Sequence, residues 1–157
     1  MKLIIIAALN RKRVIGKDGR VPWHIPEDLK RLKRLTIGHT LLMGRRTYES
    51  LQTPLPNRRH VVLTSRELPG IETYRTIPEA LEALRDQEKV FIFGGGEIFS
   101  AMLEMADEWY LTHVDDDQDG DAFFPPYEHL VGTKYRVVGE ELRDGYKFVD
   151  YKRADHL

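Results

Sequence analysis

The chain contains no cysteine among its 157 residues, and this excludes several kinds of site. Disulfides, thiolate nucleophiles and cysteine-ligated zinc or iron–sulfur centres all require a thiol. A protein of this length buries roughly two-thirds of the surface that its unfolded chain exposes, so its core needs no covalent cross-link. The absence of cysteine is typical of a reducing cytoplasm, and we expect a cytoplasmic protein.

The sequence also lacks an excess of charge of either sign. It has 24 basic and 25 acidic side chains, for a formal net charge of −1. Nucleic-acid-binding proteins usually carry a clustered basic excess. The apolar run at residues 3–9 is far shorter than the ~20 residues of a membrane helix, and no small-residue cleavage site follows it. We therefore expect neither nucleic acid nor a membrane as a partner.

Motifs for metal-dependent and acyl-transfer chemistry are missing as well. The six histidines show no metal-binding spacing, and no Gly-x-Ser-x-Gly elbow occurs. The acidic residues 115–121 match the first half of a calcium-binding loop, but Pro126 stands where the twelfth-position Glu should be. We interpret this segment as an acidic surface loop and expect no metal. A calcium-binding module remains a weak alternative, which a calcium titration without a change in melting temperature would exclude.

Strand-like and helix-like segments alternate along the chain. Short apolar runs predict strands at residues 3–9, 40–43, 60–64, 90–93, 108–114, 135–138 and 146–151. Helical spacing predicts helices at residues 26–35, 45–51, 78–84 and 98–105. In the first helix we expect Leu29, Leu32 and Leu35 to form the core stripe. We expect four basic residues to lie outside this stripe: Lys30, Arg31, Lys33 and Arg34.

This alternation predicts an α/β fold for residues 1–157 as a single domain. We expect three layers, with a mostly parallel, mixed sheet of about eight strands, an antiparallel C-terminal strand and about four flanking helices. Ligands of such sheets bind outside the carboxyl ends of the strands. The site should therefore be built from strand ends at residues 7–9, 44–45, 64–66 and 94–96.

Three features at these junctions could carry chemistry. Gly94-Gly95-Gly96 lies between a strand and a helix, which is typical of either a phosphate site or a tight turn. The segments 45–47 and 65–66 offer Arg, Thr and Ser donors for a dianionic phosphate, or are solvated surface charge. Asp28 lies beside the core stripe of a helix, where it either accepts hydrogen bonds from a cationic heterocycle or complements the helix dipole.

Together, these segments resemble dihydrofolate reductase of the bacterial chromosomal type, from residue 3 to about residue 151. The motifs that carry the resemblance are Val14-Ile15-Gly16, Pro22-Trp23-His24-Ile25-Pro26-Glu27-Asp28-Leu29, Met43-Gly44-Arg45-Arg46-Thr47-Tyr48-Glu49-Ser50, Pro54-Leu55-Pro56-Asn57-Arg58, Phe93-Gly94-Gly95-Gly96 and Tyr110-Leu111-Thr112-His113. They occur in the order and at the spacing of the family.

The resemblance implies a substrate site around Asp28. Asp28 would bind the 2-amino group and N3 of the pterin, Thr112 would be its hydroxyl neighbour, and Trp23 would hold an ordered water. Arg58 would bind the α-carboxylate of the substrate's glutamate. The residues expected to line the pterin and benzoyl pocket are Ile6, Ala7, Leu32, Leu51, Leu55 and Phe93.

The resemblance also implies NADPH as cofactor. Ala8 and Ile15 would face the nicotinamide, and residues 16–21 would close over it while leaning on the acidic loop around Gly120 and Asp121. Ser65, Arg66 and Arg75 would surround the 2′-phosphate. The other residues expected at the cofactor are Gly16, Val21, Gly44, Arg45, Arg46, Thr47, Thr64, Gly94, Gly95, Gly96, Glu97, Ile98 and Phe99.

The implied reaction moves a hydride from NADPH to C6 of 7,8-dihydrofolate and a proton to N5, giving tetrahydrofolate for one-carbon metabolism. Antifolate inhibitors would bind the same site, and the fold favours a monomer. Two residues depart from well-known members of the family. Leu32 stands where an aromatic ring often stacks on the folate, and Glu97 follows the glycines where some members have an arginine. A pyrimidine reductase of the riboflavin pathway, which should lack the Asp28, Thr112 and Arg58 set, and a nucleotide-binding protein without turnover are the alternatives.

Overall fold

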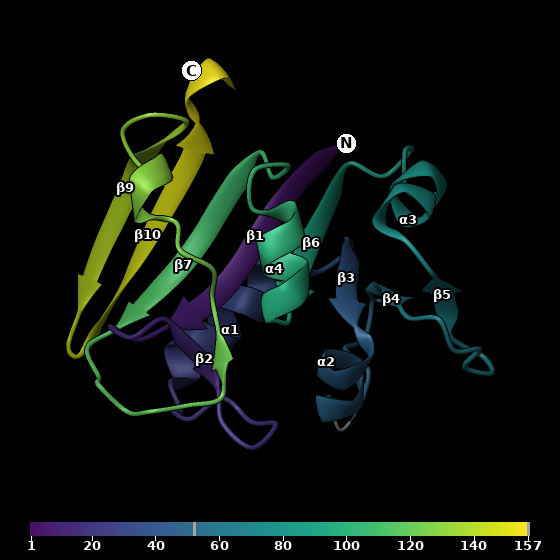
Figure 1. Cartoon of the computed structure of the whole chain (residues 1–157), viewed down its shortest axis with the longest axis horizontal. Helices are drawn as coiled ribbons and strands as arrows, with labels where there is room; N and C mark the ends of the chain where they lie inside the picture. The colour runs from purple at the N-terminus through teal and green to yellow at the C-terminus, as the bar shows by residue number, and fades with distance from the viewer. Residues whose placement is uncertain (52, 157) are drawn as a thin grey trace.

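One mixed sheet organises the part of the chain that the structure, a computed structural model, describes: residues 1–51 and 53–156, without the side chain of His156. Within that part, eight strands form the sheet in the order β5-β4-β3-β6-β1-β7-β10-β9 (Figure 1). The strands are β1 (Lys2–Leu9), β3 (Thr40–Gly44), β4 (Arg59–Leu63), β5 (Glu72–Tyr74), β6 (Lys89–Gly94), β7 (Glu108–Val114), β9 (Tyr135–Arg143) and β10 (Tyr146–Arg153).

The pairing directions confirm the predicted mixed α/β sheet. All neighbouring pairs from β5 to β7 are parallel, whereas β10 runs antiparallel to both of its neighbours, β7 and β9. In Figure 1 the arrow of β10 therefore points opposite to that of β7. A separate two-stranded pair, β2 (Val14–Gly16) with β8 (Ala122–Phe123), lies near the carboxyl ends of β1 and β7.

Four α-helices accompany the sheet in the described residues. They are α1 (Pro26–Thr36), α2 (Arg45–Ser50), α3 (Ile77–Ala83) and α4 (Gly96–Met102), with 3-10 turns η1 (Glu128–Leu130) and η2 (Ala154–His156). The predicted limits 98–105 for α4 are wrong at both ends, because the glycine turn already supplies the first helical carbonyl and the chain turns after Met102. No described helix is both long and apolar enough to cross a membrane.

The sheet has two buried faces, and alternate residues of β1 supply both. Leu3, Ile5 and Leu9 belong to the cluster on the face that α3 and α4 cover, called here the α4 face. Ile4 and Ile6 belong to the cluster on the opposite face, against which residues of α1 and α2 pack, called here the α1 face. The sheet is therefore the middle of three layers, and a strand buried on both sides needs the continuous apolar run seen in residues 3–9.

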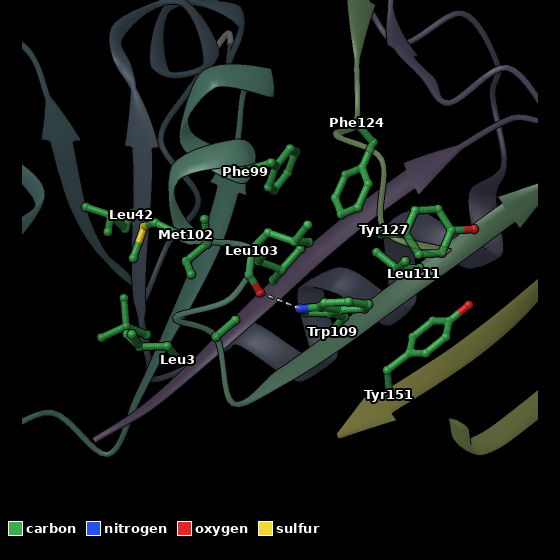
Figure 2. Close-up of a cluster of buried hydrophobic side chains, with 14 of the residues drawn as sticks. Leu3, Leu42, Phe99, Met102, Leu103, Trp109, Leu111, Phe124, Tyr127 and Tyr151 are labelled. Carbon is green, nitrogen blue, oxygen red and sulfur yellow. Dashed lines mark hydrogen bonds between the residues drawn. The ribbon is translucent and has the colours of Figure 1, made fainter. Parts of the chain in front are cut away.

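Trp109 of β7 is the centre of the α4-face core (Figure 2). Its ring stacks on Tyr135 with the ring centroids 3.9 Å apart, and its Nε1 donates to the carbonyl of Leu103 at 3.0 Å. The Tyr135 hydroxyl lies 3.0 Å from the same carbonyl and 2.5 Å from that of Ala106. These bonds tie the turn after α4 to β7 and to the start of β9.

Tyr135→Phe removes the hydroxyl that bonds the buried turn after α4. Tyr135 is 0% exposed, so water does not replace the lost bond, although the Leu103 and Ala106 carbonyls keep Trp109 Nε1 and Arg153 Nη2 as donors. We expect the free energy of unfolding, measured by urea denaturation, to fall by about 1 kcal/mol, the net value of one hydrogen bond.

Tyr74→Phe is the matched control, because the Tyr74 hydroxyl bonds the partly exposed Glu72 at the end of the sheet. This change should cost less than about 1 kcal/mol. Equal losses in the two variants would show that the buried hydroxyl has no special role in the core.

Candidate functional site

The carboxyl ends of the parallel strands meet along one edge of the sheet, beside β2 and β8 (Figure 1). The register places their last residues in one row: Ala8 opposes Thr112, Met43 opposes Gly94, and Gly44 opposes Leu63. The loops that follow these strands therefore emerge side by side. This is the edge that the sequence predicts for the ligand site.

Asp28 is held at this edge by helix α1. The helix begins at Pro26, whose fixed φ suits the first turn, and Asp28 follows in that turn. Thr112 of β7, only 2% exposed, donates its hydroxyl to Asp28 Oδ1 at 2.6 Å. The structure thus brings together two residues that lie 84 positions apart in sequence.

Burial raises the pKa of the Asp28 carboxyl above its ordinary value, because the charged form is poorly solvated there. The hydrogen bond from Thr112 and the positive charge of Arg31 act in the opposite direction and lower the pKa. Three identifiable causes therefore act on the pKa of this carboxyl, and burial is the largest. Such a group in a site is a candidate for acid–base chemistry.

Apolar side chains line the region next to Asp28 on the α1 face. The buried Ile6 belongs to the cluster there, and four half-buried residues pack against the same cluster: Leu32, Leu51, Leu55 and Phe93. With Ile6 they are five of the predicted pocket residues, and they come from β1, α1, the segment after α2 and β6. Ala7 differs, because its side chain packs against the α4-face cluster on the other side of β1.

Two predicted details of α1 are wrong. Leu29, expected in the core stripe, is 47% exposed, because the side of α1 that packs on the sheet carries Asp28 and Leu32, and Leu29 lies at its margin. Arg31, expected outside the stripe, has a side chain only 13% exposed and pairs with Asp150 of β10. Helical spacing did not reveal this position, because the acidic partner comes from a strand 119 residues away.

Arg58 is fixed by three different parts of the chain. Its Nε donates to Thr36 Oγ1 at 2.9 Å, and its two terminal nitrogens donate to the carbonyls of Pro56 and Lys33. A guanidinium has five N–H groups, so two have no partner among the described residues.

His60, which sequence reasoning missed, accepts a hydrogen bond from the Leu55 backbone at 3.1 Å and so fixes the loop between Leu55 and Arg58. Burial lowers the pKa of His60, which favours the neutral ring that this bond requires. The sequence contains no signal for this role, because the partner of His60 is the backbone N–H of Leu55, and every residue except proline has such a group.

The three glycines after β6 have different reasons to be glycine. Gly94 has φ +101°, and a Cβ there would lie 2.6 Å from the Phe99 ring; a Cβ on Gly96 would lie 2.6 Å from the Phe123 carbonyl oxygen. At Gly95, the nearest atom to a Cβ would be Thr47 Oγ1, at 3.9 Å. A Cβ at Gly95 would therefore be in ordinary van der Waals contact with Thr47, near the start of α2.

Basic and hydroxyl side chains lie along the adjoining strand ends. Thr64 follows β4, its N–H donates to the Tyr74 carbonyl at the end of β5, and its hydroxyl accepts from the Arg66 backbone at 3.2 Å. Ser65, Arg66 and Arg75 are exposed next to this junction. Four more predicted residues flank the glycine turn: Arg45, which pairs with Glu49, the exposed Arg46 and Glu97, and Ile98, which packs beside Gly44.

The side chain of Phe99 is not part of this surface. Its ring is 2% exposed and packs against Phe124 in the α4-face core. Only its backbone is left to face a ligand.

Trp23 has a buried Nε1 with no hydrogen-bond partner among the described residues. Buried polar groups of this kind are usually satisfied by water or by a ligand.

The loop of residues 16–21 is bonded to the acidic loop. Lys17 and Arg20 exchange two backbone hydrogen bonds, the Asp18 N–H donates to Asp121 Oδ2 at 3.0 Å, and the Asp121 N–H donates to the Gly16 carbonyl at 3.0 Å. Ile15 is half-buried, whereas Val21 is 59% exposed.

Basic side chains neutralise much of the acidic loop. Arg11 pairs with Asp115 and Asp117, and Lys12 pairs with Asp119. In the described part of the chain, no group of three His, Cys, Asp or Glu side chains is placed to hold a metal ion. The calcium-like spacing therefore corresponds to a salt-bridged surface loop in this structure.

Comparisons with known proteins agree on one family. A family profile described as dihydrofolate reductase matches residues 2–153. A dihydrofolate reductase of Staphylococcus aureus is 46% identical over 127 residues, which cover 81% of this chain and 80% of that protein. Dihydrofolate reductase HdrB of Haloferax volcanii is 38% identical over 166 residues, covering 98% of this chain and 84% of that protein.

A solved structure is similar over nearly the whole chain. It is described as dihydrofolate reductase from Enterococcus faecalis in complex with NADP(H) and RAB-propyl. Its TM-score to this chain is 0.87 at 31% sequence identity, and the match covers 98% of this chain and 97% of that one.

Asp28→Asn should stabilise the ligand-free protein at neutral pH. The folded pKa of Asp28 is raised, so between the unfolded and folded pKa values the folded state binds more protons, and stability falls as pH rises. The variant has no such loss and keeps an oxygen for the Thr112 hydroxyl. We expect its gain in unfolding free energy to be complete above the folded pKa and to disappear below the ordinary carboxyl pKa.

Glu72→Gln should behave in the opposite way. Hydrogen bonds from Arg59 lower the pKa of Glu72, so its ionised form stabilises the folded state at neutral pH and this contribution is lost in acid. Urea denaturation of both variants and the parent protein across the acid range measures the two signs. The same sign in both variants would contradict this electrostatic account.

Proposed function

The chain belongs to the dihydrofolate reductase family, and from that premise we propose that it reduces 7,8-dihydrofolate to tetrahydrofolate with NADPH. The observation that carries the proposal is the Asp28–Thr112 pair beside the half-buried apolar side chains of the α1 face. A half-buried carboxylate can accept two parallel hydrogen bonds from the amino group and N3 of a pterin. A pyrimidine reductase of similar fold would have no use for this pair together with Arg58.

The substrate's two ends would meet different chemistry. The pterin would lie against Asp28, with Ile6, Leu32 and Phe93 along its apolar surface. The benzoyl part would follow Leu51 and Leu55 toward the outer end of α1. There two N–H groups of Arg58 have no partner in the described part of the chain, and because three protein bonds fix its guanidinium, a carboxylate can bind with little loss of side-chain entropy.

The residues at the glycine turn fit a phosphate-bearing cofactor. The backbone of the glycine turn and the Thr47 hydroxyl next to it would bind a pyrophosphate, with Arg45 and Arg46 following Gly44. Ser65, Arg66 and Arg75, exposed at the neighbouring strand ends, would bind a 2′-phosphate and so favour NADPH over NADH. Ala8 and Ile15 would lie beside the nicotinamide, and residues 16–21 would cover it.

The chain's own part in the reaction is positioning and control of a proton. NADPH, when bound, supplies the hydride that C6 of the substrate receives. Asp28 fixes the pterin ring against the cofactor side of the pocket and polarises it, so that N5 becomes more basic. The proton would reach N5 through water, for which the buried Trp23 Nε1 supplies a hydrogen-bond donor. The surrounding apolar side chains strengthen these interactions by excluding bulk solvent.

Asp28→Asn should abolish most of the reaction while leaving the fold intact. A positioned acid–base group contributes about 10²–10⁴-fold, and we expect the rate of dihydrofolate-dependent NADPH oxidation, followed at 340 nm, to fall by this amount. The control is Glu27→Gln, which changes the adjacent carboxylate; Glu27 is bonded to Arg143 and Tyr146, away from Thr112. No oxidation by the folded parent protein would refute the proposed function.

Arg58→Leu should raise the KM for dihydrofolate and change kcat little. A hydrogen-bonded charge pair is worth about 1.5–3 kcal/mol, which corresponds to roughly 10–150-fold in KM. A small dihydropterin without the glutamate provides the matched substrate, because its KM should be the same in both proteins. If the KM for this truncated substrate rose equally, the role of Arg58 would lie in the shape of the loop rather than in the carboxylate.

A further inference from the structure

Arg31 is unlike the other basic residues of α1. Lys30, Lys33 and Arg34 are exposed, whereas the side chain of Arg31 is 13% exposed. Its Nη2 lies 2.9 Å from Asp150 Oδ1, and its Cζ lies 4.5 Å from the centre of the Phe148 ring. A guanidinium with a carboxylate on one side and an aromatic face on another is held in one position.

This position is next to the Asp28–Thr112 pair. Asp28 and Arg31 are three residues apart on α1, so their side chains leave the helix on the same side. Phe148, on which Arg31 stacks, is the direct partner of Thr112 in the ladder between β7 and β10. Asp150 lies two residues further along β10, on the same face of the sheet. Helix spacing and sheet register therefore place the fixed cation beside the carboxylate.

We propose that Arg31, held by Asp150 and Phe148, is a positioning residue that keeps Asp28 in its ionised form more than burial alone would allow. Its meaning for catalysis depends on the proposed function, but its effect on the carboxyl is a property of the ligand-free protein. The charge of Arg31 lowers the pKa of Asp28, in agreement with this arrangement. Because Arg31 is largely buried, solvent and salt screen this interaction less than they screen a surface pair.

The other ionisable groups near Asp28 do not replace Arg31. On α1, Glu27 is bonded to Arg143 of β9 and Tyr146 of β10, and Arg34 is exposed. Arg143 also lies over Phe148, but at 5.6 Å, with Glu27 and Glu141 as its partners.

Two further groups face this region from the strands, Tyr110 of β7 and Asp150 of β10. Burial raises the pKa of Tyr110 to about 12, so it is neutral in the working range. Asp150 is bonded to Arg31 itself, and its negative charge partly offsets the effect of the Arg31 charge on more distant groups. Among the four basic residues of α1, Arg31 is therefore the one that is both largely buried and on the helix face that carries Asp28.

The test is a carbon NMR titration of the Asp28 carboxyl in the ligand-free protein, with three variants. Arg31→Gln keeps a hydrogen-bond donor for Asp150 but removes the charge, and we expect it to raise the pKa of Asp28. Arg31→Lys restores a charge and should return the pKa toward the parent value. Lys30→Gln makes the same charge change on the exposed side of α1 and should leave the pKa where it is.

The proposal is overturned if Arg31→Gln leaves the pKa of Asp28 unchanged, or if Arg31→Lys shifts it as far as Arg31→Gln does. Urea denaturation of each variant shows that the titration reports the folded state. In turnover, the limb of the pH profile that Asp28 controls should move to higher pH in Arg31→Gln and stay in place in Lys30→Gln. The NMR result does not require turnover, so a failure of the proposed function and a failure of this inference are separate outcomes.

Discussion

The hydrogen bond from the Thr112 hydroxyl to the Asp28 carboxyl joins helix α1 to strand β7 at the centre of the site. The bond requires that α1 begin at the strand ends and that Thr112 face the helix, so it depends on both the helix start and the strand register. The same bond opposes the effect of burial on the carboxyl. The same desolvation has two consequences. It destabilises the ionised carboxyl in the ligand-free protein, and it strengthens the interaction of that carboxyl with a bound ring that donates hydrogen bonds to it.

The two faces of the sheet contribute different residues to the candidate site. The α1 face provides the half-buried apolar surface, Asp28 and Arg58, while the glycine turn at the same edge leads into α4, which packs on the other face. Period-two alternation in β1 is the reason, because it sends Ile6 and Ala7 to opposite faces of one strand. Two ligands, one on each side of this edge, would meet at the end of β1. This arrangement suits a transfer between two rings.

Much of the fold could be predicted from the sequence, because apolar runs and helical periods are local signals. The start of α1 at Pro26 and the buried strands are examples. Strands β2, β5 and β8 were missed, since two or three residues show no period. The exposure of Leu29 and the burial of Arg31 depend on which side of the helix faces the sheet and on Asp150, which local patterns do not encode.

The candidate site was predicted less from local patterns than from the resemblance. Spacing alone left Asp28 as either a dipole partner or a ligand-binding group, and it gave Arg58 and Thr112 no role. The structure places Thr112 on Asp28 and fixes Arg58 with three bonds, which are long-range facts. The folded loop likewise shows two things that the sequence does not: two N–H groups of Arg58 lack a partner among the residues described, and His60 accepts a hydrogen bond as a neutral ring.

Under the proposed function, this edge of the sheet brings a nicotinamide and a pterin together for direct hydride transfer. An isotope experiment tests this with NADPH doubly deuterated at C4 of the nicotinamide and dihydrofolate in ordinary water, and it locates the label in the product by mass spectrometry and NMR. Direct transfer predicts one deuterium at C6 of tetrahydrofolate and none at N5 or in solvent. Unlabelled product, or no product from the folded protein, would contradict it.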